Sequence, residues 1–239
     1  GILASNRAII VQSVDQDNPY GLNAEVAWNY GINLSYEFEL DYRIAVISFD
    51  VYRTQFENQI IVDLDSDAHQ VQFYNLNGTS YSNSMQIQID YELINRLDVR
   101  LAYRWYDVKA TYGNELMDKP FIATHRAFLN LAYETRNKWK FDATLNWQGQ
   151  KRLPSTATNP IEYQRADHSP DFFLLNAQIT KVWNDKFDIY LGAENILDYK
   201  QSDPIIAADQ PFSENFDASM VWGPVFGRNI YIGLRYRIK

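Results

Sequence analysis

The chain has 239 residues with a formal net charge of −8 at pH 7, and its composition is 46% hydrophobic, 15% aromatic and 22% charged. The acidic balance and the absence of a clustered basic patch exclude nucleic acid as a partner, and the lack of cysteine excludes disulfides and thiolate metal sites. No segment approaches the roughly 18 uncharged apolar residues of a membrane helix, which leaves membrane barrels open, because only every second strand residue meets lipid.

Alternation of apolar and polar residues predicts β-strands from one end of the chain to the other. The longest run places Trp28, Tyr30 and Ile32 on the same face as every second residue up to Leu40. No segment shows convincing helical periodicity, so the chain is predicted to be all-β. The predicted strands, which start near residue 8, include 8–14, 28–40, 85–93, 97–105, 139–147, 173–179, 187–193 and 230–238.

The connections between these strands alternate between short and long. The short ones are polar hairpin turns at Asp41-Tyr42, Asn95-Arg96, Asn137-Lys138 and Asn184-Asp185. The long ones are residues 15–23, 63–70, 113–120, 151–170 and 201–226. An up-and-down antiparallel sheet therefore carries turns at one end and loops at the other, as in outer-membrane barrels. About ten strands are expected, with the C-terminus on the periplasmic, tight-turn side.

The soluble alternative is a β-sandwich or a long single-layer sheet. Sandwich strands are typically about five or six residues long, whereas segment 28–40 is longer and suits the roughly 9–11 residues of a tilted spanning strand. A transmembrane barrel is therefore preferred. Its predicted lipid-facing residues include Phe141, Leu145, Ile189, Leu191, Ile232 and Leu234. Its predicted interior residues include Gln88, Arg100, Asp142, Asn146 and Arg235.

Several segments, taken in order, resemble the late strands of TonB-dependent outer-membrane receptors. They are FENQIIVDLD (56–65), YNLNGTSYSNSMQIQIDYEL (74–93), GQKRLPSTATNP (149–160), GAENILDYK (192–200) and WGPVFGRNIYIGLRYRIK (222–239). Together they span nearly the whole chain. The resemblance implies a 22-stranded barrel with an N-terminal plug and a periplasmic segment that contacts TonB.

The chain is shorter than such a receptor, so residues 1–239 are expected to be the C-terminal part of the barrel domain, without the plug. Polar interior residues favour a wide lumen over a narrow, filled one. The first and last strands are then expected not to pair with each other. Pairing of 230–238 with 8–14 would instead indicate a small self-contained barrel.

An acidic run offers a candidate metal site. Asp63, Asp65 and Asp67 alternate in DLDSDAH, and calcium prefers several carboxylate oxygens. An EF-hand template fails, because its sixth position is Ala68 and its twelfth is Tyr74. A calcium site and a solvated acidic loop both remain open.

The long loops offer a candidate ligand site, because mixed aromatic and charged residues on loops recognise ligands. The competing interpretation is a solvated loop rich in Pro and Asn. His69, His125 and His168 are too far apart in sequence to predict a shared metal site. The candidate ligand-binding residues are Arg152, Tyr163, Arg165, His168 and Phe212.

No hydrolase elbow, phosphate loop or zinc-protease motif occurs in the sequence, so an enzyme is not expected. The resemblance implies active import of a scarce nutrient across the Gram-negative outer membrane, with a metal chelate or corrinoid ahead of a glycan or peptide as cargo. No cofactor is expected to be required. The expected partners are outer-membrane lipid, the plug and N-terminal strands of the same protein, TonB, and a surface lipoprotein. The alternative is a passive porin or a small self-contained barrel.

Overall fold

The structure is a computed structural model that describes residues 5–14, 16–184 and 186–238. Within these ranges, helical structure is limited to two short 3-10 turns, η1 (Pro19–Gly21) and η2 (Ile161–Tyr163). No helix in the described part of the chain is long and apolar enough to cross a membrane. The strands are β1 (Ala8–Val11), β2 (Val26–Leu40), β3 (Arg43–Asn58), β4 (Ile60–Asp63), β5 (Gln70–Asn75), β6 (Ser80–Ile94), β7 (Leu97–Tyr112), β8 (Glu115–Asp118), β9 (His125–Glu134), β10 (Trp139–Gln148), β11 (Phe172–Asn184), β12 (Phe187–Glu194) and β13 (Asn229–Tyr236).

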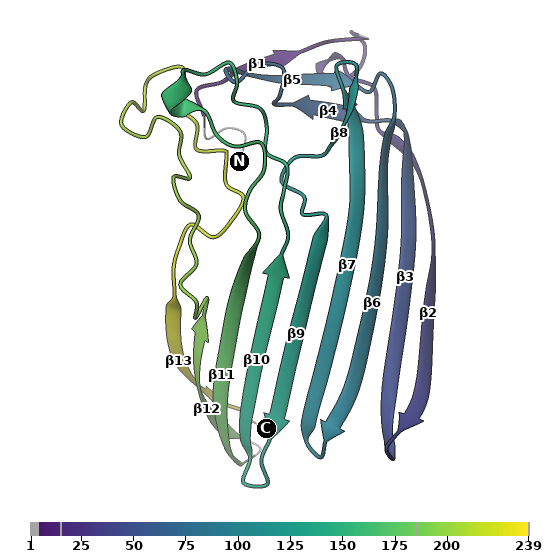
Figure 1. Cartoon of the computed structure of the whole chain (residues 1–239), viewed down its shortest axis with the longest axis vertical. Coiled ribbons are helices and arrows are strands. Elements are labelled where there is room, and N and C mark those ends of the chain that lie inside the picture. Colours follow the sequence, from purple (N-terminus) through teal and green to yellow (C-terminus); the bar gives the residue numbers. More distant parts are fainter. Residues whose placement is uncertain (1–4, 15, 185, 239) are drawn as a thin grey trace.

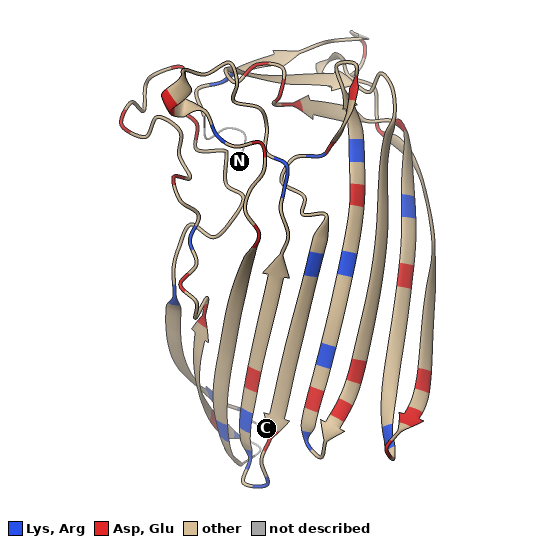
Figure 2. Ribbon diagram, viewed as in Figure 1, with Lys and Arg blue, Asp and Glu red and all other residues tan. Residues whose placement is uncertain are grey.

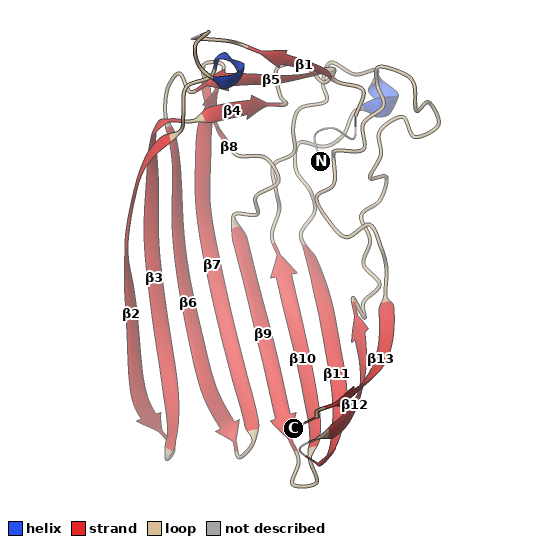
Figure 3. Cartoon of the chain, turned by 180° about the vertical axis from the view of Figure 1, so that it is seen from behind, coloured by secondary structure: helices blue, strands red, loops and turns tan. Residues whose placement is uncertain are grey.

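A ten-stranded antiparallel sheet forms a curved wall in which neighbours in space are mostly neighbours in sequence (Figure 1). Its order is β13-β12-β11-β10-β9-β7-β6-β3-β2, and β8 extends it as a hairpin partner of β7. The predicted all-β, up-and-down architecture is therefore confirmed. Figure 3 shows the same wall from behind, with the long connections at one end.

The tight turns lie together at the other end of the wall (Figure 1). Asp41 and Tyr42 have φ angles of 48° and 58°, the left-handed pair expected of a two-residue hairpin turn. Arg96 and Lys138 also have positive φ, at 71° and 58°. In the fourth predicted turn, Asp185 lies outside the described residues, as does Asp15 at the start of the first predicted loop.

The prediction that residues 8–14 form the first strand of the barrel is wrong. Strand β1 pairs in parallel with β5, and together with β4 they make a separate three-stranded sheet. This sheet lies across the loop end of the wall (Figure 3). Strand β1 has four residues, too few to span a bilayer, which needs about 9–11 residues per strand. The segment instead pairs with β5 outside the wall.

The strand register separates the two faces of the wall. Phe141, Ile179, Leu191 and Ile232 are successive partners across β10 to β13, which forms an apolar row. The next residues, starting with Asp142 opposite Gln178, form a row on the other face. The predicted division into an apolar and a more polar face follows this register, because successive side chains of a strand point to opposite faces.

Both outer strands of the wall keep one open edge within the described residues. Strand β2 pairs only with β3, and β13 pairs only with β12. The predicted lack of pairing between the last strand and β1 is confirmed, and the self-contained barrel is not what these residues form. Large apolar side chains of β2 are strongly exposed, such as Trp28 at 66% and Ile32 at 64%.

Tyrosine rings cover glycines on neighbouring strands. Gly192 lies opposite Tyr231, and a Cβ added there would lie 2.2 Å from the tyrosine Cζ. Gly233 lies opposite Tyr190 in the same strand pair, where an added Cβ would lie 2.3 Å from the ring. The glycines therefore allow the rings to lie flat across the sheet. The Tyr231 hydroxyl reaches Gln178 Oε1 at 3.0 Å, so this arrangement also links β13 to β11.

Replacing Gly192 with valine is expected to destabilise the barrel by about 1–3 kcal/mol, because the branched side chain overlaps the ring of Tyr231. Unfolding by urea in detergent measures the change. The double variant G192V/Y231A should recover part of the loss, since neighbouring residues are non-additive. Gly223→Ala is the control, because an added Cβ there meets its nearest neighbours at 3.7 Å. An unchanged midpoint for Gly192→Val would contradict the steric account.

Candidate functional site

The long connections pack against one another at the loop end of the wall (Figure 1). Their apolar centre consists of buried Leu153, Ile206, Ala207 and Met220, with partly buried Phe121, Tyr163 and Trp222 packed against it. We call segments 151–170 and 201–226 together the loop cluster. Because it has its own apolar core, the loop cluster is a packed body rather than a set of solvated loops.

The N-terminal segment is bound to this loop cluster. Arg7 Nη2 lies 2.8 Å from Asp217 Oδ2, and both side chains are almost fully buried. The backbone N–H of Asn6 donates to the carbonyl of Phe216. The segment before β1 therefore contributes to the loop cluster rather than to the wall.

Gln201 holds together the two ends of segment 201–226, which leads to β13. Its Nε2 donates to the Met220 carbonyl at 2.8 Å, and its Oε1 accepts from the backbone N–H of Trp222 and of Gly223. The side chain is buried, so these bonds satisfy polar atoms that would otherwise be costly to bury. Phe172 stacks on Tyr199 and contacts Trp222, which fixes the base of the loop cluster.

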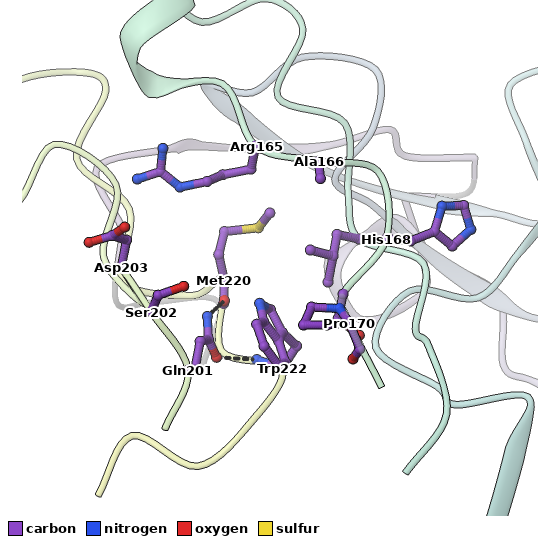
Figure 4. A pocket seen from close by; sticks show the side chains of 11 residues that line it. Arg165, Ala166, His168, Pro170, Gln201, Ser202, Asp203, Met220 and Trp222 are labelled. Carbon is purple, nitrogen blue, oxygen red and sulfur yellow. Dashed lines mark hydrogen bonds between the residues drawn. The ribbon is translucent and has the colours of Figure 1, made fainter. Parts of the chain in front are cut away.

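A cavity of about 220 Å³ lies between the two loops of the cluster (Figure 4). Arg165 reaches over it from the first loop, and Asp203 lies on the second; His168 also lines it, but its imidazole ring points away from the other lining side chains (Figure 4). Met220 and Trp222 supply its apolar lining. The volume is below the roughly 300–1,000 Å³ of a drug-sized ligand site, so the cavity suits one small polar group of a larger ligand.

The structure brings only two of the predicted ligand-binding residues to this cavity, Arg165 and His168. Tyr163 instead packs on the apolar centre, and its hydroxyl accepts a hydrogen bond from Gln210 Nε2 at 3.0 Å. Phe212 is 97% exposed and does not line the cavity. Arg152 is held elsewhere by an ion pair.

That ion pair joins the acidic segment, residues 63–67, to the loop cluster. Arg152 Nη1 and Nη2 reach the two carboxylate oxygens of Asp65 at 2.7 and 3.0 Å, a bidentate geometry. The side chains are 12% and 9% exposed. Burial lowers the pKa of Arg152, but its hydrogen bonds to Asp65 and the charge of that carboxylate raise the pKa above its ordinary value. Arg152 therefore links loops, and its role in ligand binding stays a prediction.

Asp63 terminates strand β4 and caps the following turn. Its Oδ1 accepts from the backbone N–H groups of Asp65 and Ser66, and its Oδ2 accepts from the hydroxyls of Ser66 and Tyr74. Burial raises the pKa of Asp63, but these hydrogen bonds outweigh burial and hold the pKa below its ordinary value of 3.8. The carboxylate is thus stabilised in its charged form without a metal.

The third carboxylate of the proposed calcium site also has protein partners. Asp67 Oδ1 accepts from the backbone N–H of His69 at 2.8 Å and contacts its ring nitrogen at 3.2 Å. Within the described ranges, no group of three or more His, Asp or Glu residues is arranged to hold a metal ion. The calcium hypothesis therefore gains no support from the geometry, which favours the structural role of these three residues.

Sequence reasoning missed Gln201, Asp203, Met220 and Trp222, all of which line the cavity. They lie in segment 201–226, which the sequence marks as a long loop. No periodicity or motif distinguishes them there, because their contacts depend on how two distant loops pack. The proximity of segment 151–170 to segment 201–226 is information that only the tertiary structure supplies.

The family model described as "TonB dependent receptor-like, beta-barrel" matches residues 4–196. This chain belongs to the TonB-dependent receptors. The receptors of this family are transporters of the Gram-negative outer membrane, so the apolar face of the wall is the lipid-facing side and the other face lines the lumen. A comparison with curated protein sequences finds no match.

Solved structures of TonB-dependent receptors share the fold. The ferric-catecholate import receptor Fiu from E. coli K12 is 14% identical, with a TM-score of 0.61 over 95% of this chain and 30% of Fiu. P. aeruginosa FpvA bound to a heterologous pyoverdine is 17% identical, with a TM-score of 0.60 over 90% of this chain and 27% of FpvA. The copper transporter OprC is 14% identical, with a TM-score of 0.60 over 88% of this chain and 31% of OprC. The chain thus spans less than a third of each.

Sidedness of this receptor barrel can be tested with single cysteines, because the chain contains none of its own. Long loops of outer-membrane barrels are extracellular and tight turns periplasmic. A cysteine at Phe212, which is 97% exposed, should therefore react with an impermeant maleimide added to intact cells. A cysteine at Asn137, which is also exposed but lies in a tight turn, should react only after the outer membrane is opened. Labelling of the Asn137 variant on intact cells would reverse the assignment.

Proposed function

We propose that this chain is the C-terminal part of a receptor barrel that imports a scarce nutrient by TonB-dependent active transport. The observation that carries the proposal is the family match over residues 4–196 on an open, curved wall. The open edges of β2 and β13 are where further strands of the same protein would pair. The wall then completes a larger barrel, whose lumen is occupied by a plug that lies outside this chain.

The packed loop cluster supports a role in ligand capture. It places an aromatic and charged cavity at the loop end, where solutes arrive from outside the cell. A metal chelate is the preferred cargo, because the structural neighbours include proteins described as a ferric-catecholate import receptor and a copper transporter. Corrinoids, glycans and peptides are the other cargo classes that the test should include. TonB is the proposed energy-coupling partner, and a surface lipoprotein is the proposed accessory partner.

The test is uptake by whole cells that carry or lack the full-length protein. Cells are supplied with radioactive ferric chelates, copper, cobalamin or labelled oligosaccharides, one at a time. Uptake of one class should require the receptor and should stop when TonB is deleted. The passive porin alternative predicts uptake that persists without TonB and shows no saturation at low solute concentration. That outcome would reject active import.

A further inference from the structure

Among the described residues, the lumen face of the wall carries a pair of arginines with no carboxylate partner. Arg104 of β7 lies directly opposite Arg126 of β9, and Figure 2 shows basic residues side by side at this level of the two strands. Both guanidinium groups lie over the ring of Tyr106, at 5.5 and 5.6 Å from its centroid. Arg104 Nη1 also donates to the Tyr106 hydroxyl at 2.8 Å. The tyrosine therefore orients two like charges side by side.

Other cations on this face have acidic partners, which makes this pair unusual. Arg100 pairs with Asp90, and Lys140 Nζ lies 3.3 Å from Glu134. In the part of the chain that the structure describes, neither Arg104 nor Arg126 has a carboxylate within ion-pair distance. Arg126 Nε is buried and has no hydrogen-bond acceptor. Within these residues, the positive charge of the arginine pair is thus uncompensated.

A third cation, Lys151, lies where β10 passes into the loop cluster. Lys151 follows β10, and its Nζ donates to the carbonyl of Trp222 and lies 5.5 Å from the ring centroid of Phe172. Burial lowers the pKa of Lys151, and the positive charge of Arg126 lowers it further. Lys151 does not line the cavity of the two arginines. We call Arg104 and Arg126 the cationic belt.

The surroundings of the belt are shaped for a polar ligand. A cavity of about 220 Å³ is lined by both arginines and by the neutral amide side chains of Gln86, Asn146 and Gln148. It lies where β9, β10 and β11 pass into the long loops, since Arg126 is the second residue of β9 and Gln148 the last of β10. A solute that enters from the loop side reaches this level before it meets the rest of the wall.

From this geometry we infer that the cationic belt binds an anionic oxygen group, a carboxylate or a phosphate, of the solute that the receptor imports. Guanidinium groups bind such anions through paired, charge-assisted hydrogen bonds. The amides supply further neutral donors, and the partly desolvated wall strengthens the attraction. The inference rests on the proposed import function and adds that the cargo is anionic.

The test uses the full-length receptor purified in detergent at low ionic strength. Citrate and inorganic phosphate serve as probes, and their binding is measured by titration calorimetry. The double variant R104Q/R126Q should bind citrate at least tenfold more weakly than the wild type. The matched control is Lys140→Gln, which removes a lumen-face cation that already has a carboxylate partner, and it should change binding less than twofold. Equal binding by R104Q/R126Q and the wild type, or binding of neither probe to the wild type, would overturn the inference.

A thermal melt distinguishes two groups that could occupy the belt, an anionic group of the solute and carboxylates of the plug. If the belt is free for a solute, R104Q/R126Q removes repulsion between like charges and should melt at or above the wild-type temperature. If plug carboxylates occupy the belt, the wild type binds neither probe and the variant melts lower, which overturns the assignment to cargo. Failure of probe binding leaves TonB-dependent uptake intact. Loss of TonB dependence with citrate binding retained would reject the function but not the belt.

Discussion

Leu145→Arg is expected to impair folding of the barrel, by up to about 2–4 kcal/mol if the residue lies near the bilayer midplane. Leu145 lies between Leu129 of β9 and Leu175 of β11 on the apolar face. An arginine there exposes its charge to lipid hydrocarbon, which solvates it poorly. The change can be measured as the free energy of unfolding in lipid vesicles.

The adjacent residue supplies the matched control for this substitution. Thr144 points to the opposite face, where its partners are Asn130 and Asn176. Thr144→Arg places the same charge in the lumen and loses only the hydrogen bond from Asn130 Nδ2 to the Thr144 hydroxyl, so it should cost about 1 kcal/mol. If Thr144→Arg prevented folding and Leu145→Arg did not, the two faces would have been assigned the wrong way round.

The strands of the wall could be predicted from sequence because the alternation that identifies each strand lies within a few consecutive residues. Alternation between residues 139 and 147 predicts a strand, and β10 extends over Trp139–Gln148. A one-residue shift would move the whole apolar set to the lumen, so the pattern also specifies the register. Short polar turns such as Asp41-Tyr42 have left-handed backbone angles. The alternating strands on either side make such turns recognisable in the sequence.

The loop end could not be predicted in the same way, because its contacts join residues far apart in the chain. The prediction for residues 8–14 failed since four apolar residues do not reveal that their partner is β5. The ion pair of Arg152 could not be predicted, because its partner Asp65 is 87 residues away. The cationic belt also went unrecognised, because Arg104 and Arg126 become neighbours only through the pairing of β7 with β9. Local patterns therefore describe the scaffold better than the site.

Arg152→Gln is expected to open the loop cluster locally while the wall stays folded. The substitution leaves the carboxylate of Asp65 buried, with the backbone N–H of Ser155 at 2.9 Å as a remaining donor. Loss of one partner of a buried ion pair typically costs about 3–5 kcal/mol. Backbone amides in segment 151–170 should then exchange hydrogen at least about a hundredfold faster. Hydrogen exchange read by mass spectrometry measures this in the full-length receptor.

Two further variants distinguish the ion pair from a general effect of altering the loop. Arg165→Gln changes the same loop at a residue whose guanidinium, among the described residues, donates to the neighbouring carbonyl of Gln164 at 3.2 Å and to no carboxylate, so exchange should change less than threefold. The double variant R152M/D65L should restore much of the protection, because apolar residues of similar size can replace a buried pair without leaving a charge unpaired. Unchanged exchange in Arg152→Gln would show that the apolar centre around Leu153 and Met220 holds the loops without the ion pair. Restored protection in R152M/D65L would instead show that Asp65 matters there as the partner of Arg152, and not as a calcium ligand.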